Sequence, residues 1–131
     1  MSMLPHFEIK AIEPMYQGRF ILNFPKNFEL DPYSVLKMSQ LKYIYGIGWK
    51  DIIITLHDLV GADTTKKLIK DLEIKDLRTF LLEKLDPTGQ CVEKVFIDSN
   101  FIEVDFGKFD YASDKLNSII LTIHPLRVIV E

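Results

Sequence analysis

The sequence has little cysteine, no excess of basic residues and no long apolar run. Cys91 is the single cysteine, so an internal disulfide is impossible and a disulfide-rich secreted scaffold is excluded. The 16 lysines and arginines are outnumbered by 19 aspartates and glutamates, a net charge of −3, which argues against a nucleic-acid binder that depends on phosphate contacts. The apolar runs are far shorter than the roughly 18 residues of a membrane helix, and residues 1–5 lack the pattern of a signal peptide. We therefore expect folding in a reducing, aqueous compartment and no contact with a membrane.

The residue patterns of common catalytic and metal sites are also missing. His6, His57 and His124 are far apart in the sequence, and with one cysteine they form no zinc-ligand spacing. No G-x-S-x-G nucleophile motif occurs, and the short glycine pairs lack the lysine and hydroxyl residues of a phosphate-binding loop. Asp51 and Asp58 would lie over about 20 Å apart along one strand, too far for an acid–base pair. The sequence predicts no enzyme, no metal site and no cofactor.

What the chain does have is the composition of a globular protein. Its 131 residues match the length of one domain, which we expect to span residues 1–131. Hydrophobic residues make up 47% of the sequence and are evenly distributed, which favours a packed core over disorder. No internal repeat, low-complexity tract or linker is present.

Alternating and β-branched runs predict a mainly β fold. The turn sequence Asp86–Gly89 predicts an antiparallel hairpin, because proline presets φ and glycine frees the exit. Turns at residues 98–100 and at His124-Pro125 are expected to separate the later strands, and residues 77–85 fit either a strand or a helix. The other expected strands are 18–24, 51–57, 90–97, 101–106, 118–123 and 126–130, with a long strand at 35–44 whose two faces are both partly buried.

One helix is expected after Gly61, with Asp63 or Thr64 as its N-cap. Its apolar face is predicted to contain Leu68, Ile69 and Leu72, and Lys66, Lys67, Lys70 and Asp71 are expected to be directed to solvent. Cys91 is expected in the core, as are Phe101, Phe106, Phe109 and Tyr111. Together these patterns predict an α+β chain dominated by an antiparallel, two-sheet β-barrel or sandwich of about seven strands with one helix.

The second half of the sequence resembles a known family. The Asp86–Gly89 turn is followed by a strand, then by residues 101–111 (FIEVDFGKFDY), then by a terminal pair of strands in which Ile119, Leu121 and Ile123 alternate. This order resembles the tail tube proteins of contractile-tailed bacteriophages, and the upstream order of strands, Trp49 and one helix agrees with it. The resemblance extends over roughly residues 7–131. Baseplate-end tube proteins and the ring protein of type VI secretion systems share the same fold.

The resemblance implies a structural protein that performs no reaction. Six copies would form a ring whose strands make a continuous inner β-barrel, and the rings would stack head to tail into a tube. DNA would pass through the tube without specific binding. Sheath protein and other tail or baseplate proteins would be further partners. The protein would be part of the virion tail and would assemble in the host cytoplasm.

Two sets of site residues are expected on this basis. The acidic side chains of Glu103 and Asp105 would face the lumen. Contacts between subunits would come from the mixed faces of the long strand: Val35, Ser39, Leu41, Tyr43 and Tyr45. Two alternatives remain open: a baseplate-located tube initiator or junction protein with the same fold, and a small-ligand-binding β-barrel module, which would be a monomer with an apolar internal pocket.

Overall fold

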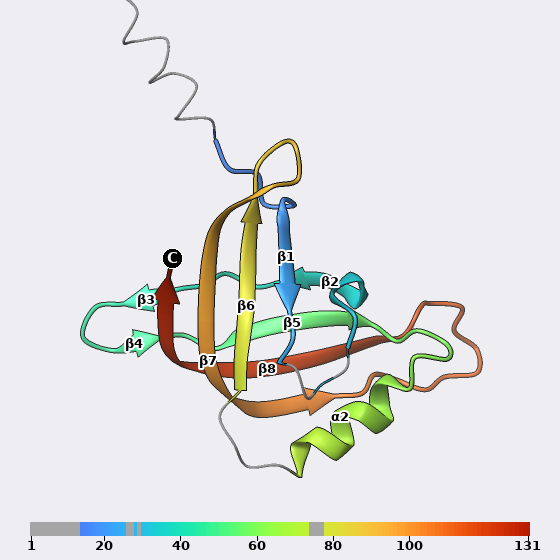
Figure 1. Cartoon of the computed structure of the whole chain (residues 1–131). Helices are drawn as coiled ribbons and strands as arrows, with labels where there is room; N and C mark the ends of the chain where they lie inside the picture. The colour runs from blue at the N-terminus through green and yellow to red at the C-terminus, as the bar shows by residue number, and fades with distance from the viewer. Residues whose placement is uncertain (1–13, 26–27, 29, 74–77) are drawn as a thin grey trace, which may run out of the picture.

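The computed structural model describes residues 14–25, 28, 30–73 and 78–131 of the chain. Its strands form an antiparallel six-stranded sheet in the order β1-β6-β7-β8-β5-β2 and a separate two-stranded sheet, β3-β4 (Figure 1). The predicted mainly β fold is therefore confirmed. The elements are β1 (Phe20–Asn23), the short 3-10 helix η2 (Pro32–Ser34), β2 (Val35–Met38), β3 (Tyr43–Ile44), β4 (Gly48–Trp49), β5 (Ile52–His57), α2 (Thr64–Leu72), β6 (Arg78–Leu85), β7 (Cys91–Asp105) and β8 (Ser118–Val130).

Strands β7 and β8 are each longer than the sequence predicts, with 15 and 13 residues. The turn expected at residues 98–100 and the break expected at His124-Pro125 are both wrong, because the two strands pair through these positions. Instead, the pairing register shifts between Asp98 and Ser99 and again between Phe101 and Glu103. Extra residues in a ladder make β-bulges that bend a strand without ending it, and a bulge tolerates proline. Turn-forming residues here mark bends inside continuous strands.

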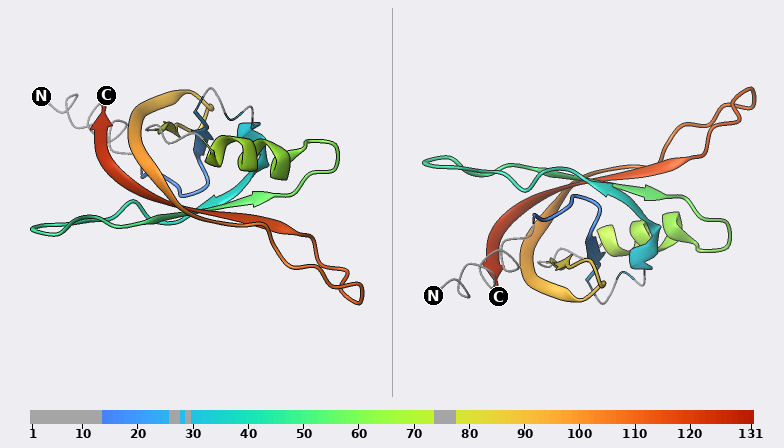
Figure 2. Two further views of the ribbon diagram at one scale, coloured as in Figure 1. Left: turned by 90° about the horizontal axis from the view of Figure 1, so that it is seen from below. Right: turned by 90° about the horizontal axis from the view of Figure 1, so that it is seen from above.

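These bends divide one sheet into two packed layers. We call layer A the part built from β2, β5, residues 118–123 of β8 and residues 101–105 of β7. Layer B contains β1, β6, residues 91–99 of β7 and residues 125–130 of β8. Figure 2 shows that α2, β1 and β6 all lie on one side of layer A and that none of the described elements covers its other side.

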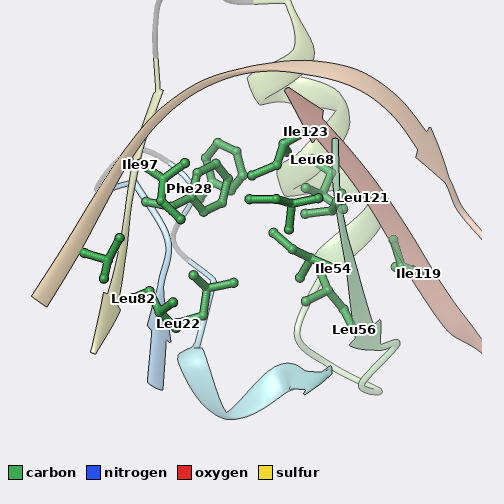
Figure 3. Close-up of a cluster of buried hydrophobic side chains, with 13 residues drawn as sticks. Leu22, Phe28, Ile54, Leu56, Leu68, Leu82, Ile97, Ile119, Leu121 and Ile123 are labelled. Carbon is green, nitrogen blue, oxygen red and sulfur yellow. The ribbon is translucent and has the colours of Figure 1, made fainter. Parts of the chain in front are cut away.

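The core fills the space between the two layers (Figure 3). Alternate residues of β5 and β8 point inward from layer A and are fully buried, and they meet buried side chains of layer B and α2. Phe28 stacks on Phe101 at 5.2 Å between ring centroids and meets the edge of Phe80 at 5.9 Å. The buried apolar residues are Leu22, Phe28, Ile52, Ile54, Leu56, Leu68, Phe80, Leu82, Val95, Ile97, Ile119, Leu121 and Ile123.

Part of the predicted core is wrong. Phe101 and Phe106 pack against the core as expected, but Phe109 is 87% exposed and Tyr111 is fully exposed. Both residues follow the end of β7 and lie in its connection to β8, where no layer covers them. Cys91 is exposed as well, because it lies at the outer end of the β6-β7 hairpin.

Helix α2 begins directly after Asp63, as predicted, but for a different local reason. Asp63 has a left-handed backbone (φ 51°), and its side chain makes no capping hydrogen bond. The buried stripe of the helix consists of Thr64, Leu68 and Asp71, so the expectation that Asp71 is directed to solvent is wrong. Ile69 and Leu72, both predicted to face the core, are 48% and 40% exposed. The helix contacts the two layers along a narrow stripe of residues with a polar residue at each end.

The polar residue at the end of that stripe forms a buried ion pair. The guanidinium of Arg78, at the start of β6, donates from Nε to Asp71 Oδ2 at 2.7 Å and from Nη2 to the Asp71 backbone carbonyl. Only 10% of the Arg78 side chain and 5% of the Asp71 side chain are exposed. The guanidinium also lies 4.7 Å from the ring centroid of Phe101. The pair joins α2 to both layers.

Replacing Asp71 by alanine should destabilise the protein by about 3 kcal/mol, because the guanidinium of Arg78 would remain buried without its carboxylate. Urea unfolding followed by circular dichroism measures this loss. Glu73→Ala, which removes an exposed carboxylate from the same helix end, serves as the control and should change stability by less than about 0.5 kcal/mol. Equal effects of the two substitutions would contradict a structural role for the pair.

A second polar group lies at the bend on the outer face of layer B. Asp98 Oδ1 accepts a hydrogen bond from the Thr79 hydroxyl at 2.6 Å, and its Oδ2 accepts one from Arg127 Nε at 3.0 Å. The Thr79 hydroxyl, and next the Arg127 guanidinium, lower the pKa of Asp98 below its ordinary value of 3.8. The ionised carboxylate thus connects β6, β7 and β8 where β7 and β8 bend.

Asp98 should make part of the stability depend on pH. Because its folded-state pKa lies below the unfolded value, its contribution is fully present above pH 3.8 and is lost as the pH falls through the folded-state pKa. Asp98→Asn should therefore lower the free energy of unfolding by about 1 kcal/mol at neutral pH and weaken the acid dependence. Urea unfolding of both proteins between neutral pH and pH 3 tests this. A parallel pH dependence would contradict it.

Candidate subunit interface

The uncovered face of layer A presents a regular array of side chains. Cross-strand pairing places Lys37, Thr55, Ile120 and Asp105 in one row across β2, β5, β8 and β7. The neighbouring row contains Ser39, Ile53, Thr122 and Glu103. Because side chains alternate along a strand, every member of these rows points away from the core. Glu103 and Asp105, the two predicted lumen residues, thus lie two positions apart on one exposed face.

Layer A also has two open edges. Strand β2 pairs only with β5, and residues 101–105 of β7 pair only with β8, among the described strands. Ile53 exchanges hydrogen bonds with residue 39, donating to Ser39 Oγ at 2.8 Å and accepting from the Ser39 N–H at 2.7 Å. Hydrogen-bonding directions alternate along an antiparallel ladder, so Met38 on β2 and Val104 on β7 direct their N–H and C=O groups outward. Such edges are templates for pairing with another chain.

The β3-β4 hairpin projects from one end of layer A (Figure 2). Gly46 and Gly48 have φ values of 85° and 109°, which allow the tight turn between the two strands. Tyr43 packs on Trp49 at 5.0 Å between ring centroids and stiffens the hairpin. Tyr45, at the tip, is 95% exposed and Ile47 is 75% exposed. The hairpin therefore presents apolar side chains that nothing within the described chain covers.

The connection between β7 and β8 projects from the opposite end (Figure 2). Asn117 anchors its base, donating to the backbone carbonyl of Phe106 at 3.2 Å and to Asp58 Oδ2 at 2.8 Å. Gly107 is required here, because its φ is 100° and a Cβ would overlap the side chain of Asn117. Three large apolar residues of this connection are exposed: Phe109, Tyr111 and Leu116.

The predicted contact residues do not lie on a single long strand. That strand ends at Met38 and resumes as β3, while Lys50 donates to the Lys42 carbonyl in between. Val35 and Leu41 are partly buried against the core, Ser39 joins β5, Tyr43 is half-exposed and Tyr45 is at the hairpin tip. Strand alternation could have indicated Lys37 as an outward residue. No feature of the sequence indicates that Ile47, Phe109 and Leu116 are exposed.

Groups suited to metal binding or catalysis are scarce in the parts of the chain that the structure describes. No three histidine, cysteine, aspartate or glutamate side chains come together there in an arrangement that could bind a metal ion. His124 Nδ1 lies 2.9 Å from Asp51 Oδ1, and both side chains are about half exposed. Across the described ranges, no helix has the length and apolar character needed to span a membrane. What the described residues do offer is a set of surfaces for association.

Comparisons with known proteins agree with this description of the fold. No protein family and no curated protein matches the sequence. The chain is similar to solved structures of contractile injection systems. A chain of the baseplate of the anti-feeding prophage is 14% identical, with 91% of this chain and 96% of that chain covered and a TM-score of 0.63.

Two further structures come from an extracellular contractile injection system called PVC. A chain of its extended sheath–tube complex is 14% identical over 95% of this chain and 96% of that chain, with a TM-score of 0.69. A chain of its sheath/tube terminator is 16% identical over 92% of this chain and 99% of that chain, with a TM-score of 0.67. At these identities the likeness shows that the chain has the fold found in the tube, terminator and baseplate structures of such systems.

Proposed function

We propose that the chain is a structural, non-enzymatic subunit of the tube or baseplate of a contractile tail or injection system, assembling as rings of six copies that stack. The observation that carries this proposal is layer A, whose outer face of four strands is covered by no described element and whose two edges are open among the described strands. Structures of similar fold come from such systems, one of them a six-fold symmetrised baseplate. Sheath protein and other tail or baseplate proteins are the further partners, and assembly takes place in the cytoplasm of the producing cell.

Layer A has the strand directions that a ring requires. Its four strands alternate in direction, so the open edges of β7 and β2 run opposite to each other. When a second copy is related by rotation about a ring axis, its β7 edge meets the β2 edge of the first as an antiparallel neighbour. Repetition of this contact closes a barrel and leaves no lateral edge unpaired.

In this ring the uncovered face of layer A lines the channel. The opposite face is occupied by the core, layer B and α2, so it cannot face a lumen. Glu103 and Asp105 then face the channel together with Lys37, and the serine, threonine and isoleucine side chains between them are uncharged. Each copy thus contributes two negative charges and one positive charge to these rows, which does not favour retention of DNA. DNA or another cargo would pass without specific binding.

The two apolar projections lie at opposite ends of the layer A strands, one at each axial end of the ring. When rings stack in one orientation, the β3-β4 hairpin of one ring meets the β7-β8 connection of the next. This contact is heterologous, so it lengthens the stack of rings without closing it. Contiguous exposed apolar surface of this kind is usually covered in an assembly.

A baseplate-located tube initiator or junction protein is the alternative. It would form the same ring but would contact a different protein at one axial end of the ring. Baseplate and terminator structures are among those of similar fold, which supports this alternative. A small-ligand-binding module would need an internal pocket, whereas buried side chains fill the space between layers A and B.

Purified wild-type protein at high concentration should form six-fold rings that are visible by negative-stain microscopy and elute as oligomers from a size-exclusion column. Met38→Pro removes an N–H at the β2 edge of layer A and should abolish these rings. Val130→Pro is the matched control, because it alters an open edge of layer B and should leave the rings intact. Circular dichroism verifies that both variants fold. A wild-type protein that remains monomeric would contradict the proposal, as would rings formed by folded Met38→Pro.

Tyr45→Asp should shorten or abolish stacks while leaving single rings, because it places a charge at the exposed hairpin tip. The fold should be unaffected, since the side chain is 95% exposed. Val92→Asp, at an exposed apolar position near the outer end of the β6-β7 hairpin in layer B, controls for the added charge and should stack normally. Stack lengths in micrographs measure the effect. Normal stacks formed by Tyr45→Asp would exclude the hairpin from the axial contact.

A further inference from the structure

We infer that Lys37 of one copy forms an ion pair with Glu103 or Asp105 of the next copy in the same ring. This pair selects the lateral contact in which the β2 edge of one copy meets the β7 edge of its neighbour. The inference rests on the proposed ring, because it identifies which side chains meet where β2 of one copy adjoins β7 of another. We call this junction the seam.

The first observation is how charge is distributed over the uncovered face of layer A. The lysine lies on one edge strand, β2, and the two carboxylates lie on the opposite edge strand, β7. The outward residues between them on β5 and β8 are uncharged: Ile53, Thr55, Ile120 and Thr122. Asp51, at the end of this face, is already bonded to His124. Within one copy, the opposite charges are thus separated by the width of the layer.

The second observation is strand register. A shift of one residue would turn every side chain to the other face, so antiparallel pairings that keep both uncovered faces continuous differ by two residues. In one such register Lys37 lies directly opposite Glu103, and in the next it lies opposite Asp105. Directly paired residues have Cβ atoms about 5 Å apart, within reach of a lysine–carboxylate contact. Lys37 therefore meets a carboxylate in either register.

The same charges disfavour a two-fold contact. A dimer through two β2 edges would bring Lys37 against Lys37, and a dimer through two β7 edges would bring carboxylates against carboxylates. Like charges directly opposite each other destabilise strand pairs. Only the contact between the β2 edge of one copy and the β7 edge of the next brings opposite charges together at both edges. That is also the contact from which a ring can be built.

The seam pair also changes the electrostatics of the channel. As free carboxylates, Glu103 and Asp105 would repel DNA phosphates. With Lys37 of the neighbour beside them, one of the two negative charges is neutralised at each seam. The channel is then less acidic than its carboxylates suggest.

Charge reversal with complementation tests the inference. Lys37→Glu makes both edges acidic, and Glu103→Lys combined with Asp105→Asn makes both edges basic. Asparagine at position 105 retains an oxygen for the hydrogen bond from the Gly107 N–H. Each variant alone should need at least about tenfold more protein for half-maximal ring formation at low salt. An equimolar mixture should restore rings, because the two chains can alternate around a ring with an even number of copies.

The matched control is Lys66→Glu, which reverses an exposed charge on α2 and should assemble like the wild type. Analytical ultracentrifugation and negative-stain microscopy measure assembly, and circular dichroism verifies folding. If both reversed variants assemble alone like the wild type, or if their mixture fails to assemble, the seam pair is wrong while the ring stands. If the wild type itself forms no rings, the proposed function fails and the seam pair with it.

Discussion

The structure depends on the paired bends of β7 and β8. At residues 98–101 and 123–127 both strands change direction while remaining hydrogen-bonded to each other, so one sheet supplies both layers of the fold. The ionised carboxylate of Asp98 joins three strands at this point, and Arg78 joins α2 to the aromatic side chains beneath it. Without the bends, the inward residues of β5 and β8 would have no opposing layer, and layer A would lose the support that keeps its outer face in order.

Among the described strands, the same bends leave one end of β7 and one end of β8 paired on one side only, and β1 and β2 are the outer strands of the sheet. Two of these edges belong to layer A and run in opposite directions, which makes the layer complementary to a rotated copy of itself. The exposed aromatic tips at its two ends add surface along the other direction. A chain of this kind buries its core alone but leaves its sheet unfinished, and association with further copies is the simplest way to complete it. The structures of similar fold belong to assemblies of many subunits.

Local patterns in the sequence predicted most elements but not their continuity. The alternation in β5 and the Asp86–Gly89 turn are properties of neighbouring residues, and the structure confirms both. By contrast, Ser99 and Pro125 look like turn residues but lie opposite each other inside a continuous ladder, which only the partner strand determines. Phe109 and Tyr111 look like core residues, and their exposure depends on the distance from the end of β7 to the nearest layer. For the candidate interface, Glu103 and Asp105 could be placed on one strand face from alternation, whereas the open edge beside them is a property of the sheet order.

Strand alternation in layer A has an evolutionary consequence. Along β5 and β8, each residue that fills the core is followed by one that points to the uncovered face, so stability and surface chemistry are encoded at interleaved positions. Substitutions at one set leave the other nearly untouched. In the proposed ring, the surface that lines the channel could therefore change residue by residue while the residues that stabilise the fold stay the same.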